Sequence, residues 1–132
     1  MLLLEVDVGT SSIKVSVVKT AAQKCFTSAQ YPGSESAITS LQPDWAEQSP
    51  EMWLLHVPEA ILKVIATKLS SPKDIGGIGI GYQMHGLVLM DKDQKVLLDS
   101  IISCDSRAVQ LGNYAFHAIG KAFVNTTNVA IE

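Results

Sequence analysis

The fold is decided by residues 2–19, LLLEVDVGTSSIKVSVVK. Apolar residues recur at every second position before the polar turn at 9–12 and again after it. A period of two is typical of a strand with one buried face, so we expect two strands joined by a tight turn. A third strand is expected over about residues 24–31. Three successive strands with short connections predict an antiparallel meander whose first hairpin is central.

A helix is predicted after a loop at residues 32–48 that is rich in Ser, Pro and Gly. Ser49-Pro50-Glu51 supplies an N-cap, a proline at the first helical position and an acid in the first turn. The predicted buried face comprises Trp53, Val57, Ile61, Val64 and Ile65. Pro58 falls inside the helix and is expected to kink it. We expect the helix to end at Ser70-Ser71-Pro72.

The second half of the chain predicts more strands and a final helix. A strand is expected over residues 76–82, and a hairpin around the turn at 91–94. Asp105 is expected to cap a helix whose buried face would hold Ala108, Leu111, Ala115 and Ile119. The order of strand meander, helix, strands and helix predicts an α/β layered fold.

Composition narrows the class of protein. The 132 residues suit one domain or a piece of a larger one, and 47% apolar residues are enough for a core. The net charge of −3 and the scattered basic residues do not favour nucleic acid as a partner. Cys25 and Cys104 form no CxxC pair, which favours a reducing compartment. Without a signal peptide or an apolar run of ~18 residues, we expect a cytoplasmic protein with no membrane partner.

The sequence does not match several well-known cofactor- and metal-binding motifs. A dinucleotide fingerprint beginning at Gly77 and Gly79 would need a glycine where Tyr82 stands. A phosphate loop from Gly81 to Gly86 lacks the Lys-Ser/Thr that should follow it. The three histidines and two cysteines do not have metal-ligand spacing, so zinc has little support.

Residues 7–14, Asp-Val-Gly-Thr-Ser-Ser-Ile-Lys, carry the most specific chemistry. The turn offers backbone N–H and hydroxyl donors around a concavity that suits a phosphate. Asp7 at its rim would hold Mg²⁺ directly or through water, because this ion favours carboxylate oxygens and retained waters. The alternative is a plain polar hairpin with an Asp-assisted turn. The segment by itself leaves both interpretations open.

Four segments in order resemble the FGGY family of carbohydrate kinases, which belongs to the actin-like, ribonuclease H-like superfamily of ATPases. Residues 7–14 resemble its first phosphate motif, and 43–48 with Glu51 and Trp53 its Trp-x-Glu-Gln segment. Residues 78–87 resemble the sugar-binding strand and turn, and 104–108 the Asp-x-Arg segment. Gln-Met-His-Gly at 83–86 is most similar to the xylulokinases of this family. Its relatives that act on glycerol typically carry Arg-Glu at positions 84 and 85.

The resemblance implies a ribonuclease H-like mixed sheet with helices, and a kinase that uses ATP and Mg²⁺. The implied reaction converts D-xylulose to D-xylulose 5-phosphate. Asp7 would be the metal-binding and catalytic residue. The implied phosphate contacts are Gly9, Thr10, Ser11, Ser12 and Lys14, and the implied sugar contacts are Gln83, Met84, His85, Asp105 and Arg107. Glu5, Pro58 and Ser103 depart from the family pattern.

The resemblance also implies that residues 1–132 are the N-terminal portion of the first of two domains. The C-terminal ATP-binding domain and the general base would lie beyond this chain, so we expect the chain alone to be inactive. A sugar is the implied partner, and a homodimer is one expected assembly. The alternative is a non-catalytic module of actin-like fold that binds a sugar or a protein.

Overall fold

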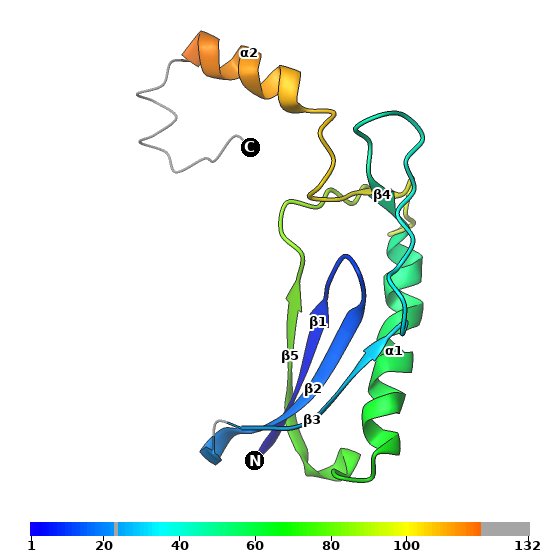
Figure 1. The fold of residues 1–132 in the computed structure, drawn as a ribbon, viewed down its shortest axis with the longest axis vertical. Helices are drawn as coiled ribbons and strands as arrows, with labels where there is room; N and C mark the ends of the chain where they lie inside the picture. The colour runs from blue at the N-terminus through cyan, green and yellow to red at the C-terminus, as the bar shows by residue number, and fades with distance from the viewer. Residues whose placement is uncertain (23, 120–132) are drawn as a thin grey trace.

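The computed structural model describes residues 1–22 and 24–119 and is built on a four-stranded sheet (Figure 1). The strand order is β3 (Lys24–Tyr31), β2 (Ile13–Lys19), β1 (Leu2–Val8) and β5 (Ile75–Tyr82). β1 pairs antiparallel with β2 and β2 antiparallel with β3, whereas β1 pairs parallel with β5. The predicted meander and the central position of its first hairpin are confirmed.

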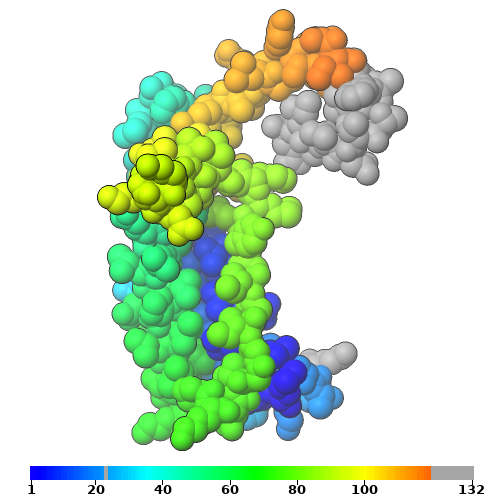
Figure 2. Space-filling model, turned by 180° about the vertical axis from the view of Figure 1, so that it is seen from behind, coloured from blue at the N-terminus to red at the C-terminus, as the bar shows by residue number. Residues whose placement is uncertain are grey.

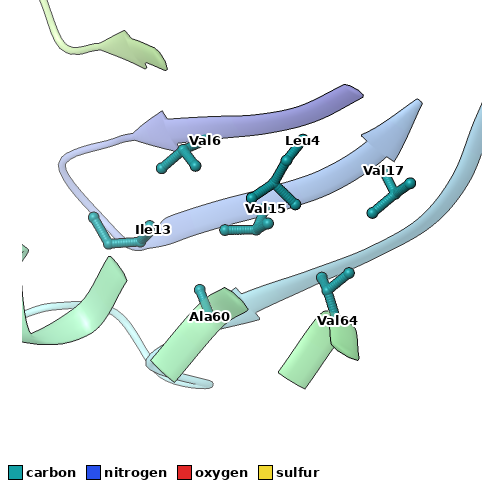
Figure 3. Close-up of a cluster of buried hydrophobic side chains, with 7 residues drawn as sticks. All are labelled: Leu4, Val6, Ile13, Val15, Val17, Ala60 and Val64. Atoms are coloured by element: carbon teal, nitrogen blue, oxygen red, sulfur yellow. The ribbon is translucent and has the colours of Figure 1, made fainter. Parts of the chain in front are cut away.

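One face of the sheet is covered by α1 (Pro50–Ala66), and the core lies between them (Figure 3). The buried residues are Leu4, Val6, Ile13, Val15, Val17, Ala60 and Val64. Because side chains alternate across a strand, β1 and β2 send their apolar positions toward α1 and their polar positions to the opposite face. The predicted helix face is confirmed at Val64, with Trp53, Val57 and Ile61 packed beside it.

The prediction of Ser49 as the N-cap of α1 is confirmed, although its side chain makes no capping hydrogen bond. Pro58 lies inside the helix, as predicted. The predicted end needs correction, because the helix ends at Ala66, before Ser70. There Thr67 closes the last turn, its hydroxyl donating to the Val64 carbonyl at 2.7 Å. A local hydroxyl contact therefore ends the helix before the downstream proline is reached.

Truncating Val64 should test this core. We expect Val64→Ala to lower the free energy of unfolding by roughly 2–3 kcal/mol, because two methyl groups leave a site that is 1% exposed. Chemical denaturation measures the loss. Glu59→Ala is the control, since Glu59 is exposed on the same helix and its truncation should change stability by less than about 0.5 kcal/mol. Equal effects of the two changes would contradict this packing.

A second layer joins the loop before α1 to the chain after β5. β4 (Glu47–Gln48) pairs antiparallel with β6 (Ser100–Ile101). Two short 3₁₀ turns lie elsewhere: Thr20–Ala22 connects β2 to β3, and Pro72–Asp74 precedes β5. The hairpin expected around 91–94 is present as a turn with the single bridge Met90–Val96, without extended strands.

The last helix differs from its prediction. α2 (Val109–Ile119) extends away from the sheet at one end of the molecule (Figures 1 and 2). None of its residues is buried, and Leu111 is 72% exposed, so the predicted face is not a core face. Asp105 is not its N-cap, because α2 begins at Val109, four residues after Asp105. No helix in residues 1–22 or 24–119 has the length and apolar content needed to cross a membrane.

Candidate functional site

The turn at residues 9–12 lies between β1 and β2 and is tied to the rest of the chain. A Cβ on Gly9 would lie 3.0 Å from the backbone oxygen of Ser12, so the close turn favours glycine there. The Ser36 N–H donates to the Ser11 carbonyl at 2.7 Å, which joins the turn to the loop before α1. Ser12 is buried, whereas Ser11 is exposed. The predicted phosphate-binding residues at 9–12 therefore form a compact, anchored turn.

Thr10 connects this turn to the segment after β5. Its hydroxyl donates to Gln83 Oε1 at 2.8 Å, and its carbonyl accepts from Gln48 Nε2 at 2.8 Å. The Gln83 N–H also donates to the Val8 carbonyl at 3.0 Å, because β5 runs parallel to β1 and ends beside it. The register of two strands thus brings the predicted phosphate turn and the predicted sugar segment into direct contact.

Asp7 lies at the end of β1 on the face opposite α1. Its register partners are Lys14 on β2 and Gly81 on β5, and Glu5 shares its face two residues earlier. A Cβ on Gly81 would meet no atom within 4 Å, so there is open space beside this stretch of β1. Within residues 1–22 and 24–119 no three His, Cys, Asp or Glu residues cluster as a metal site. A single carboxylate beside open space fits Mg²⁺ that keeps most of its waters.

Lys14 is the second residue of β2, directly opposite Asp7 of β1. It is exposed and lines a shallow hollow of about 330 Å³ with Ser16, Ser28, Ala29 and Gln30. The structure therefore places Lys14 on the same face as Asp7 and one strand over.

The predicted sugar residues surround two hollows near the end of β5. Gln83 and His85 contribute to one of about 420 Å³, and His85, Asp105 and Arg107 to another of about 540 Å³. His85 lines both, and its backbone adopts φ 62°, a left-handed conformation uncommon for a residue with a side chain. Met84, in contrast, is 69% exposed and lines neither hollow.

Arg107 organises the wall of the larger hollow. Its Nη2 lies 2.7 Å from Asp105 Oδ2 and 2.6 Å from Glu47 Oε1, so Arg107 forms ion pairs with two carboxylates. The guanidinium also lies 3.8 Å from the centre of the Trp45 ring, a cation–π contact. Sequence reasoning did not assign Glu47 and Trp45 to this cluster, although the Trp-x-Glu-Gln segment was the available signal.

Asp105 is the acceptor at the centre of this cluster. Its carboxylate also accepts the backbone N–H groups of Ala46 at 2.7 Å and of Arg107 at 2.9 Å. The Arg107 hydrogen bonds, aided by the Ala46 N–H and opposed by burial, lower the pKa of Asp105 from 3.8 to about 2. Asp105 is therefore ionised at neutral pH and fixes the loop at 44–47 against the chain at 105–107.

Acid should remove the stabilisation that Asp105 supplies. Because its pKa is lower in the folded protein, the stabilisation is complete above 3.8 and is lost as the pH falls toward about 2. We expect the melting temperatures of wild type and Asp105→Asn to differ most near neutral pH and to converge between about pH 4 and pH 2. Thermal melts across this range measure the gap. A gap that stays constant down to about pH 2 would contradict the account.

A comparison against protein-family models shows which family the chain belongs to. Residues 2–128 match the N-terminal domain of the FGGY family of carbohydrate kinases. The chain belongs to this FGGY family. The family assignment and the actin-like ATPase fold that the sequence suggested are both confirmed.

Individual relatives are xylulose kinases. The chain is 36% identical to xylulose kinase of Bacillus subtilis over 77% of its length, and 30% identical to that of Escherichia coli over 80%. A solved xylulose kinase from Brucella ovis is 29% identical, covers 95% of this chain and superimposes with a TM-score of 0.82. The FGGY chain spans 20% of the length of the first two relatives and 25% of the third.

Proposed function

We propose that this chain is the N-terminal portion of an ATP-dependent kinase that converts D-xylulose to D-xylulose 5-phosphate. The observation that carries the proposal is the hydrogen bond from Thr10 to Gln83. It joins a donor-rich turn to a segment that borders two hollows, so a phosphate donor and a polyol would meet there. Relatives named xylulose kinase support the choice of sugar, and the share of their length that this chain spans supports a larger protein.

On the phosphate side, Asp7 and the turn have separate tasks. Asp7 would hold Mg²⁺, which neutralises charge on the transferring phosphoryl group when bound. The backbone N–H groups at 9–12 and the hydroxyl of the exposed Ser11 would contact phosphate oxygens. The Thr10 hydroxyl donates its hydrogen to Gln83, so Thr10 serves mainly to hold the turn. Phosphoryl transfer depends chiefly on alignment and charge neutralisation, which suits a rigid turn and a carboxylate.

On the sugar side, His85 and the Arg107 cluster would contact hydroxyl groups. His85 borders both hollows and can donate or accept a hydrogen bond with a polyol. Because Asp105 and Glu47 both bind the guanidinium, Arg107 is held in place at the edge of the larger hollow. We propose that Met84 supplies apolar contact only when further chain packs over its exposed side chain.

The adenine site and the base that accepts the sugar proton belong, in this proposal, to the remainder of the protein. The isolated 132-residue chain should then lack kinase activity. The proposal includes a cytoplasmic location, consistent with the two free cysteines, and a homodimer as the assembly.

A coupled assay of the complete protein tests the function. ADP formation is measured with D-xylulose, L-xylulose, gluconate and glycerol as acceptors. The proposal expects the highest kcat/KM with D-xylulose and no ADP formation from the 132-residue chain. A higher kcat/KM for another acceptor would overturn the sugar assignment, and activity in the isolated chain would overturn the division of labour.

His85 supplies a test of the sugar pocket. We expect His85→Ala to raise KM for D-xylulose roughly tenfold, the value of one hydrogen bond, while KM for MgATP stays unchanged. Initial rates with one substrate varied and the other saturating measure both constants. His56→Ala is the control, since His56 packs against Tyr31 and lines neither hollow. A rise in KM for MgATP alone would place His85 on the phosphate side.

A further inference from the structure

Gln48 is the largest polar side chain among the fully buried residues of the described chain, at 1% exposed. Its Nε2 donates to the carbonyl of Thr10 at 2.8 Å and to that of Ala37 at 3.2 Å. Its Oε1 accepts from Trp53 Nε1 at 3.2 Å. Both amide hydrogens and the amide oxygen are therefore used. One side chain joins the 9–12 turn, the loop before β4 and helix α1.

The contact with Thr10 fixes one peptide unit of the turn. A peptide bond is planar and trans, so its carbonyl and the following N–H point in opposite directions. Holding the Thr10 carbonyl toward buried Gln48 turns the Ser11 N–H away from the interior. No hydrogen bond within residues 1–22 and 24–119 joins that N–H to another protein group. It is a preorganised donor directed toward solvent beside the exposed Ser11 side chain.

Gln83 also holds Thr10, through a hydrogen bond with the Thr10 side chain. With its carbonyl bound to Gln48 and its hydroxyl bound to Gln83, Thr10 has neither group free to rotate. Preorganised donors stabilise developing charge because they need no reorganisation during the reaction. A buried amide that fixes such a donor therefore acts on the reaction through the turn.

We propose that Gln48 is a positioning residue that sets the Ser11 N–H for phosphate binding. This inference rests on the proposed function, because it takes the 9–12 turn to be the phosphate site. A purely structural role would lower stability and leave the balance between the two substrates unchanged. A positioning role changes the constants for the nucleotide and spares those for the sugar.

The test uses two variants of the complete protein and a matched stability control. Gln48→Met keeps the approximate shape but removes all three hydrogen bonds. Gln48→Glu keeps an acceptor for Trp53 and loses both donors to the carbonyl groups. We expect both variants to raise KM for MgATP, or lower kcat, by about tenfold, with KM for D-xylulose within about twofold of wild type. The loss in Gln48→Glu should be at least as large as in Gln48→Met, because both variants lack the amide N–H donors to the Thr10 and Ala37 carbonyls.

Val64→Ala supplies the control, since it destabilises the same domain from the far part of α1. It should lower the melting temperature with both Michaelis constants unchanged. If the Gln48 variants match Val64→Ala in kcat and in both Michaelis constants, the positioning role is overturned. Calorimetric binding of a non-hydrolysable ATP analogue with Mg²⁺ separates this inference from the proposed function. A wild type that binds the analogue but phosphorylates no sugar ends the sugar-kinase proposal, and weaker analogue binding by Gln48→Met then still supports positioning. Unchanged analogue binding by Gln48→Met would overturn it.

Discussion

Replacing Asp7 by Asn should lower kcat of the complete protein by about 10²–10³-fold, with little change in melting temperature. Asn keeps the size of the side chain but removes the negative charge that would hold Mg²⁺ beside the 9–12 turn. Asp7 is on the outer face of β1, so the core against α1 is undisturbed. Steady-state rates at saturating MgATP and sugar, with thermal melts of both proteins, measure the two quantities.

Glu5→Gln is the matched control for Asp7→Asn. Glu5 lies on the same strand and the same face, two residues farther from the turn than Asp7, and the substitution removes the same charge. We expect its kcat to stay within about threefold of wild type, because simple loss of negative charge on this face is screened. Equal losses in the two variants would contradict a specific role for Asp7.

Replacing Arg107 by Met should lower kcat/KM for D-xylulose by on the order of tenfold to a hundredfold. The substitution leaves the carboxylates of Asp105 and Glu47 close together without their shared cation. Their repulsion would open the wall of the larger hollow and release the loop at 44–47. Initial rates with sugar varied at saturating MgATP measure the loss, and KM for MgATP should stay within about twofold.

Arg107→Lys is the control that separates charge from geometry. Lysine keeps the positive charge but lacks the planar fork that now binds two carboxylates and stacks on Trp45. We expect an intermediate loss of kcat/KM. Wild-type values for both variants would contradict a role of this cluster in sugar binding.

Local periodicity was enough to predict the antiparallel part of the sheet. The alternation in residues 2–19 predicts strands whose apolar positions share one face. Because the 9–12 turn is short, it brings β1 and β2 together as an antiparallel pair. The parallel partner of β1 could not be identified this way, because β5 follows a long crossover and its glycines carry no face preference. The helical period at 109–119 predicted α2 but not its exposure. A periodic apolar face indicates that a helix has an apolar side, but not which part of a protein covers that side.

For the site, too, the local segments were predicted but the contacts between them were not. The turn and the segment at 83–86 were predicted separately, and their contact through Thr10 and Gln83 depends on the parallel register of β1 and β5. Asp105 was expected to be a helix cap because acids before helices usually are. Instead, its carboxylate binds the distant Ala46 N–H and the nearby Arg107, and the helix begins only at Val109. The sequence did not indicate a role for Gln48 in the site, because its partners are two backbone carbonyls and an indole that only the fold brings together.

The central claim is that the 9–12 turn and the 83–86 segment form one site for phosphate transfer to a sugar. A crystal structure of the complete protein with Mg²⁺, a non-hydrolysable ATP analogue and D-xylulose tests it most directly. The account predicts the terminal phosphate at the Ser11 N–H, Mg²⁺ on the Asp7 side, and the sugar between His85 and Arg107. Phosphate or sugar bound elsewhere, with the turn and the two hollows empty, would contradict it.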